Sequence, residues 1–344
     1  MRFVIVGLGS MGKRRIRLLK KYVDELQTDD GDEWSIYGVD SREDRCAEVQ
    51  SQYDIKAGKD LDKILEEGQF DAAFVCTSPL SHASIITKCL NAGLHVFTEI
   101  NLVSDDYDEN IRLANKKSRV LYLSSTPMHR REMKYIKKWV DSRDTKLTYR
   151  YNVGQYLTEW HPWETYNDFF VSNKRTNGCR ELFAIELPWI IEAFGAIIEY
   201  KSQHSKLTKL HFDFDDSYQV IVKHSSGVHG VLMVDVVTPK SGRRMEIFGE
   251  NSYLIWEGTP DSLYELNSGT KELKKIILYN EYDHQSGYEG FVVEDAYSEE
   301  IKEFISCIKE NRMASYSLEE DIDVLRIIDG IESDCKYSMY STLY

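Results

Sequence analysis

The amino-acid sequence predicts an α/β protein of two domains: a doubly wound parallel sheet in residues 1–124 and an α+β domain with a large, mostly antiparallel open sheet in residues 125–344. Two observations support this prediction. As far as about residue 125, short apolar runs alternate with helical patterns, as in parallel sheets whose strands are joined by helices. From 207 to 278, apolar runs follow one another directly, and turn signals such as Ser226-Gly227 separate them, as in antiparallel hairpins.

The N-terminal elements follow in a regular order. The first apolar run, Phe3–Val6, is β-branched at three of its four positions, which fits a strand buried on both faces. Further strands are predicted at Trp34–Val39, Ala72–Cys76, Leu94–Thr98 and Val120–Ser124, with helices at Lys13–Leu26, between Asp60 and Gly68, at Ser81–Asn91 and at Asp105–Lys116.

The C-terminal elements are more varied. A helix at Arg131–Val140 and a strand at Lys146–Val153 lead into the aromatic-rich loop 154–170, GQYLTEWHPWETYNDFF. A helix at Glu181–Phe194 precedes seven apolar runs between 207 and 278, of which KLHFDF at 209–214 is the first. Two helices follow, one at Glu294–Glu310 and one that starts at Ser317, where Glu320 completes a capping box.

Composition excludes several functional classes. The net charge of -14 argues against binding to nucleic acid or to an anionic membrane, and no apolar run approaches membrane-spanning length. The six cysteines form no C-x-x-C and no cluster with histidine at zinc spacing, so no metal site is predicted. Scattered free thiols suit a reducing compartment, and we expect a cytoplasmic location.

The motif that organises the chain is the glycine turn after the first strand. Gly7, Gly9 and Gly12 have the spacing G-x-G-x-x-G, directly between a predicted strand and a predicted helix. In this context the first glycine permits a tight turn, the second lets the backbone approach a pyrophosphate, and the third lets the helix pack on the strand. The motif therefore predicts a Rossmann dinucleotide site, against the alternative of a turn that binds no ligand.

An acidic residue, Asp40, ends the second predicted strand, 28 residues after Gly12. An acid at this place usually binds the ribose hydroxyls of NAD and repels the 2′-phosphate of NADP. Arg42, two residues further on, leaves NADP open as a second cofactor. The alternative for Asp40 is a turn or capping residue. Thr77, Ser78, Pro79 and Glu99 also follow predicted strands, at the sheet edge where ligands of such folds bind.

These features together resemble the Gfo/Idh/MocA family, which includes glucose–fructose oxidoreductase and inositol dehydrogenase. The resemblance rests on GLGSMG at 7–12, VCTSPLSHASI at 75–85, AGLHVFTEINL at 92–102 and the helix that ends in Phe194-Gly195. The loop at 154–166 is similar to that of a subgroup from bacterial surface-sugar biosynthesis. The resemblance implies NAD(P)-dependent hydride transfer on a sugar or nucleotide sugar, and a homo-oligomer, either a dimer or a tetramer.

The resemblance also implies a set of cofactor-binding residues. The phosphate turn is Gly7, Gly9, Ser10, Met11 and Gly12, and Asp40 is the ribose acid with Arg42 beside it. The stretch lining the cofactor contains Thr77, Ser78, Pro79 and His82, and Glu99 is the acid of the family's E-K-P motif.

Two positions depart from the family pattern. The lysine of E-K-P is Ile100 in this chain, the catalytic histidine aligns with Ile185, and no histidine lies between His161 and His204. Alcohol oxidation needs a group that accepts the hydroxyl proton, and isoleucine has none. Two hypotheses follow: an oxidoreductase with non-standard acid–base residues, or a catalytically degenerate protein that binds a dinucleotide or sugar nucleotide as a sensor or assembly subunit.

Glu186 and His161 are the candidates for proton transfer. Glu186 adjoins the lost histidine position, and His161 lies in the aromatic loop. The alternatives are a helix carboxylate paired with Arg180 or another base, and a packed contact. The candidate substrate-binding residues are Tyr156, Trp160, Trp163, Arg180 and Glu181, of which Glu181 has the alternative of complementing the helix dipole.

Overall fold

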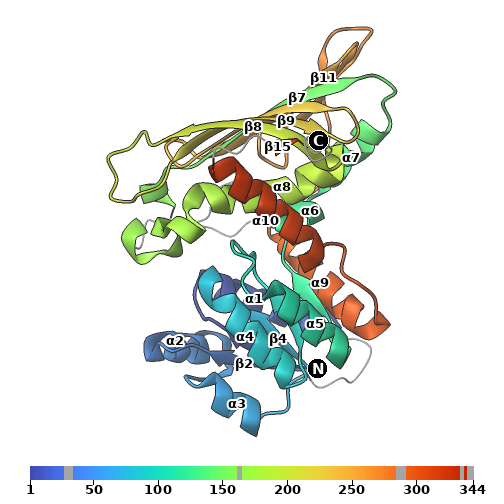
Figure 1. Cartoon of the computed structure of the whole chain (residues 1–344). Helices are drawn as coiled ribbons and strands as arrows, with labels where there is room; N and C mark the ends of the chain where they lie inside the picture. The colour runs from blue at the N-terminus through green and yellow to red at the C-terminus, as the bar shows by residue number, and fades with distance from the viewer. Residues whose placement is uncertain (27–33, 161–164, 284–291, 334–336, 339–344) are drawn as a thin grey trace. The chain divides into compact units, whose positions relative to one another are not determined.

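The computed structural model describes residues 1–26, 34–160, 165–283, 292–333 and 337–338. The chain divides into two compact units (Figure 1). The first unit is Met1–Ser125 together with Tyr297–Asp323, and the second is Thr126–Ala296 together with Val324–Tyr344. In the described ranges, no helix combines the length and the apolar character needed to cross a membrane.

The first unit is built on a six-stranded parallel sheet in the order β3-β2-β1-β4-β5-β6. Its strands are β1 (Arg2–Val6), β2 (Ser35–Val39), β3 (Lys56–Gly58), β4 (Ala72–Val75), β5 (His95–Thr98) and β6 (Leu121–Leu123). Its helices are α1 (Ser10–Leu26), α2 (Glu43–Tyr53), α3 (Leu61–Glu67), α4 (Pro79–Asn91), α5 (Tyr107–Lys117) and most of α9 (Glu294–Glu310). The strand order reverses between β1 and β4, which confirms the predicted doubly wound sheet.

Side chains of β1 alternate between the two faces of this sheet. Phe3 and Ile5 join a buried cluster with residues of α1, α2 and α9, whereas Val4 and Val6 join a second cluster with residues of α3, α4 and α5. The continuous apolar run is therefore buried on both sides, as the sequence indicated. α2 and β3 lie between Arg42 and Asp60, where no element was predicted.

The first unit includes a segment from far along the chain, Tyr297–Asp323, in addition to the residues before the predicted boundary at 124. Most of α9 lies in this segment. Ile301, Phe304 and Ile305 are buried in the cluster on the α1 face of the parallel sheet. The Phe304 ring meets the rings of Phe74 and Phe97 edge-on, at centroid distances of 5.4 and 5.6 Å. The sequence predicted α9 as a helix but carried no local signal of the sheet on which it packs.

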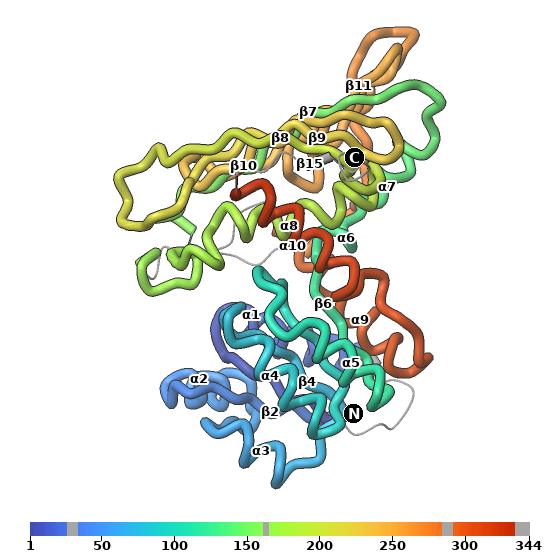
Figure 2. The backbone as a smooth tube through the Cα atoms, viewed as in Figure 1, coloured from blue at the N-terminus to red at the C-terminus, as the bar shows by residue number. Residues whose placement is uncertain are grey.

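The second unit contains a nine-stranded sheet in the order β14-β13-β12-β11-β7-β10-β9-β8-β15, and Figure 2 traces its path. Its strands are β7 (Leu147–Gly154), β8 (Ile197–Ser205), β9 (Ser217–His224), β10 (His229–Asp235), β11 (Gly242–Gly249), β12 (Ser252–Trp256), β13 (Leu263–Leu266), β14 (Leu273–Lys275) and β15 (Tyr337–Ser338). Its helices include α6 (Thr126–His129), α7 (Arg131–Asp141), α8 (Gly178–Phe194) and α10 (Leu318–Glu332). Among the strands that the structure describes in this sheet, β7 and β10 are the one parallel pair, which confirms the predicted mostly antiparallel sheet.

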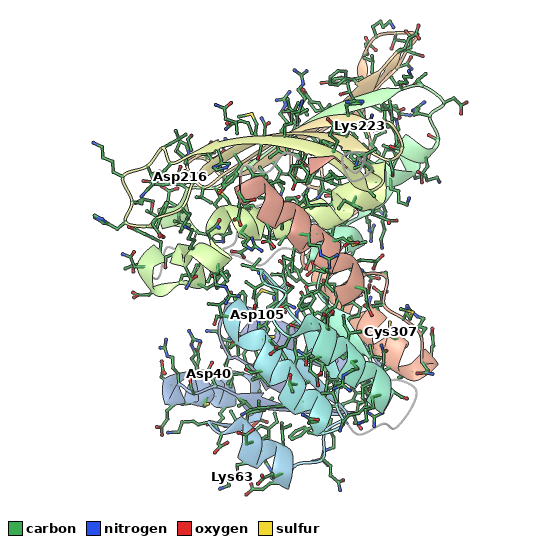
Figure 3. All side chains as sticks on the ribbon, viewed as in Figure 1. Asp40, Lys63, Asp105, Asp216, Lys223 and Cys307 are labelled. Carbon is green, nitrogen blue, oxygen red and sulfur yellow. The ribbon has the colours of Figure 1, made fainter. Side chains whose placement is uncertain are left out.

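The prediction of a strand at 209–214 is wrong, because these residues form a loop. The first strand after α8 is instead β8, which the sequence analysis did not predict. In this loop the rings of Phe212 and Phe214 stack on each other, with their centroids 4.0 Å apart. The buried carboxylate of Asp216 fixes the loop by accepting the N–H groups of Leu207 and Thr208 (Figure 3). β8 was missed because its sequence, IIEYKSQHS, is largely polar.

Candidate dinucleotide site

Two glycines are required by the backbone of the turn between β1 and α1. Gly7 has φ +94°, and a Cβ there would lie 2.7 Å from the carbonyl carbon of Cys76. A Cβ at Gly12 would lie 1.9 Å from the Gly7 carbonyl oxygen, because α1 begins so close to the turn. Both positions therefore exclude any other residue for reasons of chain geometry.

Gly9 is not required by the fold in this way. A Cβ at Gly9 would meet, among the described residues, only the Arg45 guanidinium, whose Nη1 would lie 3.5 Å away. The open space beside Gly9 lies at the N-terminus of α1, which begins at Ser10 and includes Met11 in its first turn. Backbone N–H groups at such a terminus bind phosphate, so the turn fits the pyrophosphate of a dinucleotide.

Asp40 lies at the end of β2 and connects it to the glycine turn (Figure 3). One carboxylate oxygen accepts the Leu8 N–H at 2.8 Å, and the other accepts the Arg42 N–H at 2.9 Å. Asp40 is only 8% exposed. These bonds give Asp40 the turn-fixing role that the sequence left as an alternative, and its contact with ribose stays a prediction.

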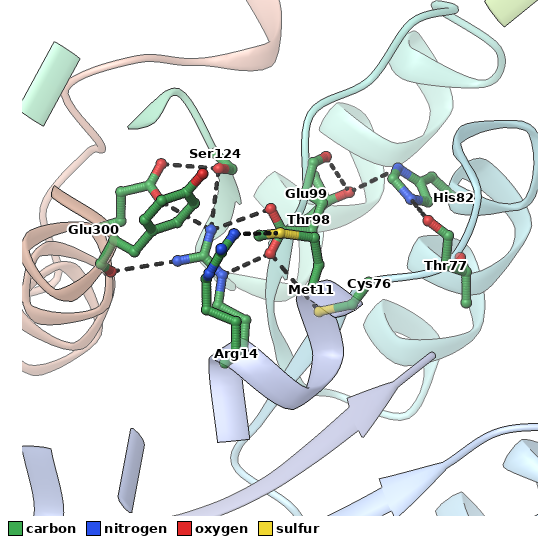
Figure 4. Close-up of polar contacts among 11 residues, drawn as sticks. Met11, Arg14, Cys76, Thr77, His82, Thr98, Glu99, Ser124 and Glu300 are labelled. Carbon is green, nitrogen blue, oxygen red and sulfur yellow. Dashed lines mark hydrogen bonds and ion pairs between the residues drawn. The ribbon is translucent and has the colours of Figure 1, made fainter. Parts of the chain in front are cut away.

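The turn Thr77-Ser78-Pro79 joins β4 to α4, and Pro79 is the first residue of the helix. His82 is buried beneath it, and Figure 4 shows its contact with Thr77, where Nε2 lies 2.9 Å from the carbonyl oxygen. Nδ1 of His82 lies 2.5 Å from Asn101 Oδ1. Burial lowers the pKa of His82 by more than the two contacts raise it, so the pKa lies below its usual value and the neutral ring is favoured. In this arrangement His82 holds the Thr77 backbone in place.

Glu99 is part of a buried ion cluster that sequence reasoning missed. Its carboxylate binds Arg15 Nε at 2.6 Å and Nη2 at 3.1 Å, and Arg15 Nη2 also binds Glu300 at 2.8 Å (Figure 4). Ser124 Oγ donates to Glu300 at 2.8 Å. Burial opposes the charge on Arg15, but Glu99 and Glu300 keep its pKa well above the usual value. The cluster ties α1 to the end of β5 and to α9, and Glu99 already has a cationic partner.

Glu186, a predicted proton-transfer residue, is buried in the second unit with three donors. Its carboxylate accepts the Tyr151 hydroxyl, the Trp189 indole N–H and Arg243 Nε, each at 2.7 Å. This is the paired helix carboxylate that the sequence left as the alternative, with Arg243 as the base. Arg180 instead holds α10, through Asp329 at 2.6 Å and Glu332 at 2.5 Å.

Glu181, in the first turn of α8, has a different environment. Its Oε2 is buried and, in the part of the chain that the structure describes, lacks a hydrogen-bond partner. Burial raises the pKa of Glu181 to about 8. Ile185 follows one helical turn later on the same face. An acid with this pKa exists in both protonation states near neutral pH, so it can donate or accept a proton.

The structure only partly describes the aromatic loop. Tyr156 and Trp160 are half-buried, and the Trp160 ring packs near Gly178 at the start of α8. His161 and Trp163, which were predicted as catalytic and substrate-binding residues, lie outside the described residues.

The parallel sheet and its glycine turn have the arrangement typical of dinucleotide-binding folds. Residues 1–125 match the family model GFO_IDH_MocA, an oxidoreductase family with an NAD-binding Rossmann fold. Residues 1–125 of the first unit are therefore similar to the NAD-binding Rossmann domain of that oxidoreductase family. This match supports the expected cofactor, NAD, and favours the oxidoreductase of the two hypotheses that the sequence left open.

Similarity extends beyond the first unit. The chain is 25% identical to the myo-inositol 2-dehydrogenase of Thermotoga maritima over 345 residues, which cover 93% of this chain and 92% of the relative. Levoglucosan dehydrogenase in complex with NADH has the same fold, with a TM-score of 0.82, 13% identity and coverage of 98% of this chain and 99% of the other. The myo-inositol 2-dehydrogenase of Lactobacillus plantarum has a TM-score of 0.75 and 16% identity, and 97% of this chain and 96% of the other are covered.

Proposed function

We propose that the protein transfers a hydride between NAD and a CH–OH carbon of a sugar or cyclitol. The observation that carries this proposal is the phosphate turn, where a glycine stands at Gly9 although a Cβ there would meet only ordinary contacts with the Arg45 guanidinium among the described residues. The relatives named for inositol and levoglucosan support a polyhydroxylated substrate. Asp40 favours NAD over NADP, because a carboxylate attracts ribose hydroxyls and repels a 2′-phosphate.

The proton of the reacting hydroxyl needs an acceptor, and we assign this role to Glu181. Glu181 has a buried oxygen without a partner among the described residues and a pKa near 8. Glu186 is a weaker candidate, because protonation would break its pair with Arg243. A general base of suitable pKa contributes about 100- to 10,000-fold in rate, which is enough to replace the histidine that aligns with Ile185.

Substrate binding and assembly complete the proposal. Tyr156, Trp160 and Trp163 supply ring faces and a hydroxyl suited to a sugar or nucleotide sugar, as in the surface-sugar subgroup that the loop resembles. A homo-oligomer forms through the exposed face of the nine-stranded sheet. There Ile221 and Val231 lie opposite each other on β9 and β10, 58% and 41% exposed. The enzyme acts in the cytoplasm on a small-molecule substrate.

One observation favours a second function, that of a catalytically degenerate binding protein. Ile100 and Ile185 replace both residues that the family uses for acid–base chemistry, as aligned above. Such a protein would bind NAD or a sugar nucleotide and act as a sensor or assembly subunit without turnover.

The test begins with NADH titrated into the purified protein and followed by protein fluorescence. The protein is then incubated with NAD and a panel of inositols, anhydrosugars, aldoses and nucleotide sugars, while the nicotinamide absorbance is recorded. We expect saturable binding and reduction of NAD by at least one member of the panel. Binding without reduction across the whole panel would support the degenerate protein, and absence of NADH binding would contradict both functions.

A further inference from the structure

The Thr77 backbone, which His82 holds, lies directly against the phosphate turn. A Cβ at Gly7 would be 2.8 Å from the Thr77 backbone nitrogen and 2.7 Å from the Cys76 carbonyl carbon. Cys76 also donates its backbone N–H to the Val6 carbonyl oxygen, at the end of β1, at 2.7 Å. Because the two turns are in contact, the position of the Thr77 backbone affects the shape of the dinucleotide site.

Both nitrogens of the His82 ring face oxygen atoms that accept hydrogen bonds. Nε2 faces the Thr77 carbonyl oxygen at 2.9 Å, and Nδ1 faces Asn101 Oδ1 at 2.5 Å. Nδ1 also lies 3.3 Å from Thr98 Oγ1 (Figure 4), and that hydroxyl donates its own proton to the Glu99 carbonyl oxygen at 3.1 Å. Because each of these partners accepts, this arrangement suits a ring with a proton on each nitrogen.

The neutral ring, which burial favours, has a proton on one nitrogen only. The Thr77 carbonyl oxygen accepts and cannot donate, so it needs that proton on Nε2, and Nδ1 then needs a donor. Asn101 has a donor to give, because its Nδ2 is buried and makes no hydrogen bond in the part of the chain that the structure describes. Rotation of the amide about its Cβ–Cγ bond exchanges Oδ1 for Nδ2. Asn101 therefore suits both forms of the ring and leaves the Nε2 proton on Thr77 in each.

The charged and titratable groups around this pair have partners of their own. Tyr107 lies beyond the amide and donates its hydroxyl proton to Asp321 at 2.6 Å. Burial and Asp321 raise the pKa of Tyr107, and the amide opposes this only in part, so the hydroxyl keeps its proton. After burial and the two hydrogen bonds, Glu99 is the charged group that acts on the pKa of His82, and it is paired with Arg15 at 2.6 Å. Among the described residues, the position of the ring proton thus depends on the amide.

We propose that Asn101 is a positioning residue of the dinucleotide site and that it acts through His82. By keeping a proton on Nε2, whatever the charge of the ring, Asn101 holds the Thr77 carbonyl and with it the turn beside the phosphate turn. Asn101→Asp would offer acceptors only and would draw the last ring proton to Nδ1, and Asn101→Leu would offer neither donor nor acceptor. The proposal rests on the dinucleotide binding of the proposed function, and it depends neither on hydride transfer nor on the substrate.

The experiment measures NADH binding by the purified protein from about pH 6 to about pH 9, where a histidine changes its charge. The variants are Asn101→Leu and Asn101→Asp, with Asn110→Leu as the matched control. Asn110 is also a buried asparagine that holds α4, because it donates to the Ala83 carbonyl oxygen at 3.1 Å and accepts from Thr87 Oγ1 at 2.7 Å. Thermal unfolding at each pH checks that every variant is folded where binding is measured.

We expect Asn101→Leu to weaken NADH binding about tenfold or more at every pH, as for the loss of a buried hydrogen bond, and Asn110→Leu to weaken it less than about threefold. Relative to the wild type, Asn101→Asp should bind NADH within about threefold near pH 6, where the ring carries both protons, and about tenfold more weakly near pH 9. Nitrogen NMR of histidine-labelled protein reads the ring proton directly, and His82→Gln identifies the signal. The proton should stay on Nε2 in the wild type and move to Nδ1 in Asn101→Asp near pH 9.

Equal NADH affinities for the wild type and a folded Asn101→Leu would overturn the proposal. An equal loss in Asn110→Leu would also overturn it, because that loss would reflect a general loosening of α4. If Asn101→Leu does not fold, the wild-type spectrum decides, and a neutral His82 ring with its proton on Nδ1 would contradict the role given to Asn101. Failure of the wild type to bind NADH would instead refute the dinucleotide site on which the proposal rests.

Discussion

Replacing Arg15 with methionine tests the buried cluster of Arg15, Glu99 and Glu300. The Arg15 and Glu300 side chains are fully buried, and Glu99 is 9% exposed. Methionine fills most of the space but removes the guanidinium that faces the Glu99 and Glu300 carboxylates. Removing one partner of a buried ion pair costs about 3–5 kcal/mol, a large part of the total free energy of unfolding of a typical domain, about 5–15 kcal/mol.

The assay is urea unfolding followed by circular dichroism, with Lys13→Met as the control on the same helix. Lys13 pairs with Glu48 at 2.8 Å, but both side chains are exposed, at 32% and 47%, so this variant should lose less than about 1 kcal/mol. The triple change Arg15→Met, Glu99→Gln and Glu300→Gln should recover part of the loss, because it also neutralises the two carboxylates that faced Arg15. A loss for Arg15→Met no larger than that of the control would refute the reasoning.

Three further predictions follow from single positions. Gly9→Ala should unfold at nearly the wild-type temperature and bind NADH at least tenfold more weakly. Gly12→Ala should lose stability as well as NADH affinity, because its Cβ would lie 1.9 Å from a backbone oxygen. Calorimetry measures the loss of stability, and NADH titration measures the loss of binding. Glu181→Gln should lower turnover about 100-fold or more, and its pH–rate profile should lose the change in rate near pH 8. The control Glu192→Gln, exposed on the same helix, should keep both the turnover and the shape of the profile. Burial lowers the pKa of His224 to about 4, below the value of about 6.5 for an unfolded histidine, so the unfolded chain binds more protons between these values. Stability should therefore fall as the pH drops from about 6.5 to 4, and this His224-dependent part of the slope should be absent in a His224→Phe variant.

Local patterns in the sequence predicted much of the fold. The strand, turn and helix at the N-terminus are where the glycine spacing put them. Asp60 caps α3 by accepting the Lys63 N–H, and Ser317 and Glu320 form the expected capping box, with bonds of 2.8 and 3.2 Å. These features succeed because each depends on residues within one turn of each other.

Contacts between residues that lie far apart in the chain could not be predicted from the sequence. Glu99 meets Arg15 across 84 positions and Glu186 meets Arg243 across 57, so no local spacing marks either pair. The raised pKa of Glu181 arises from burial, which depends on packing around α8 and not on its neighbours in the chain. The phosphate turn could thus be predicted as a site, whereas the ion-pair partners of Glu99 and Glu186 and the pKa of Glu181 could not.

The position of α9 in the first unit has a consequence for synthesis of the chain. A ribosome delivers the parallel sheet and its first helices more than 170 residues before Phe304, counted from the end of β6 at Leu123. During that interval the aromatic row of Phe74, Phe97 and Tyr122 lacks α9, whose Phe304 ring contacts all three rings in the folded protein. The first unit must therefore wait, without α9 and prone to association, while β7 to β14 of the second unit are translated. A nascent chain released before α9 would expose that aromatic row to chaperones.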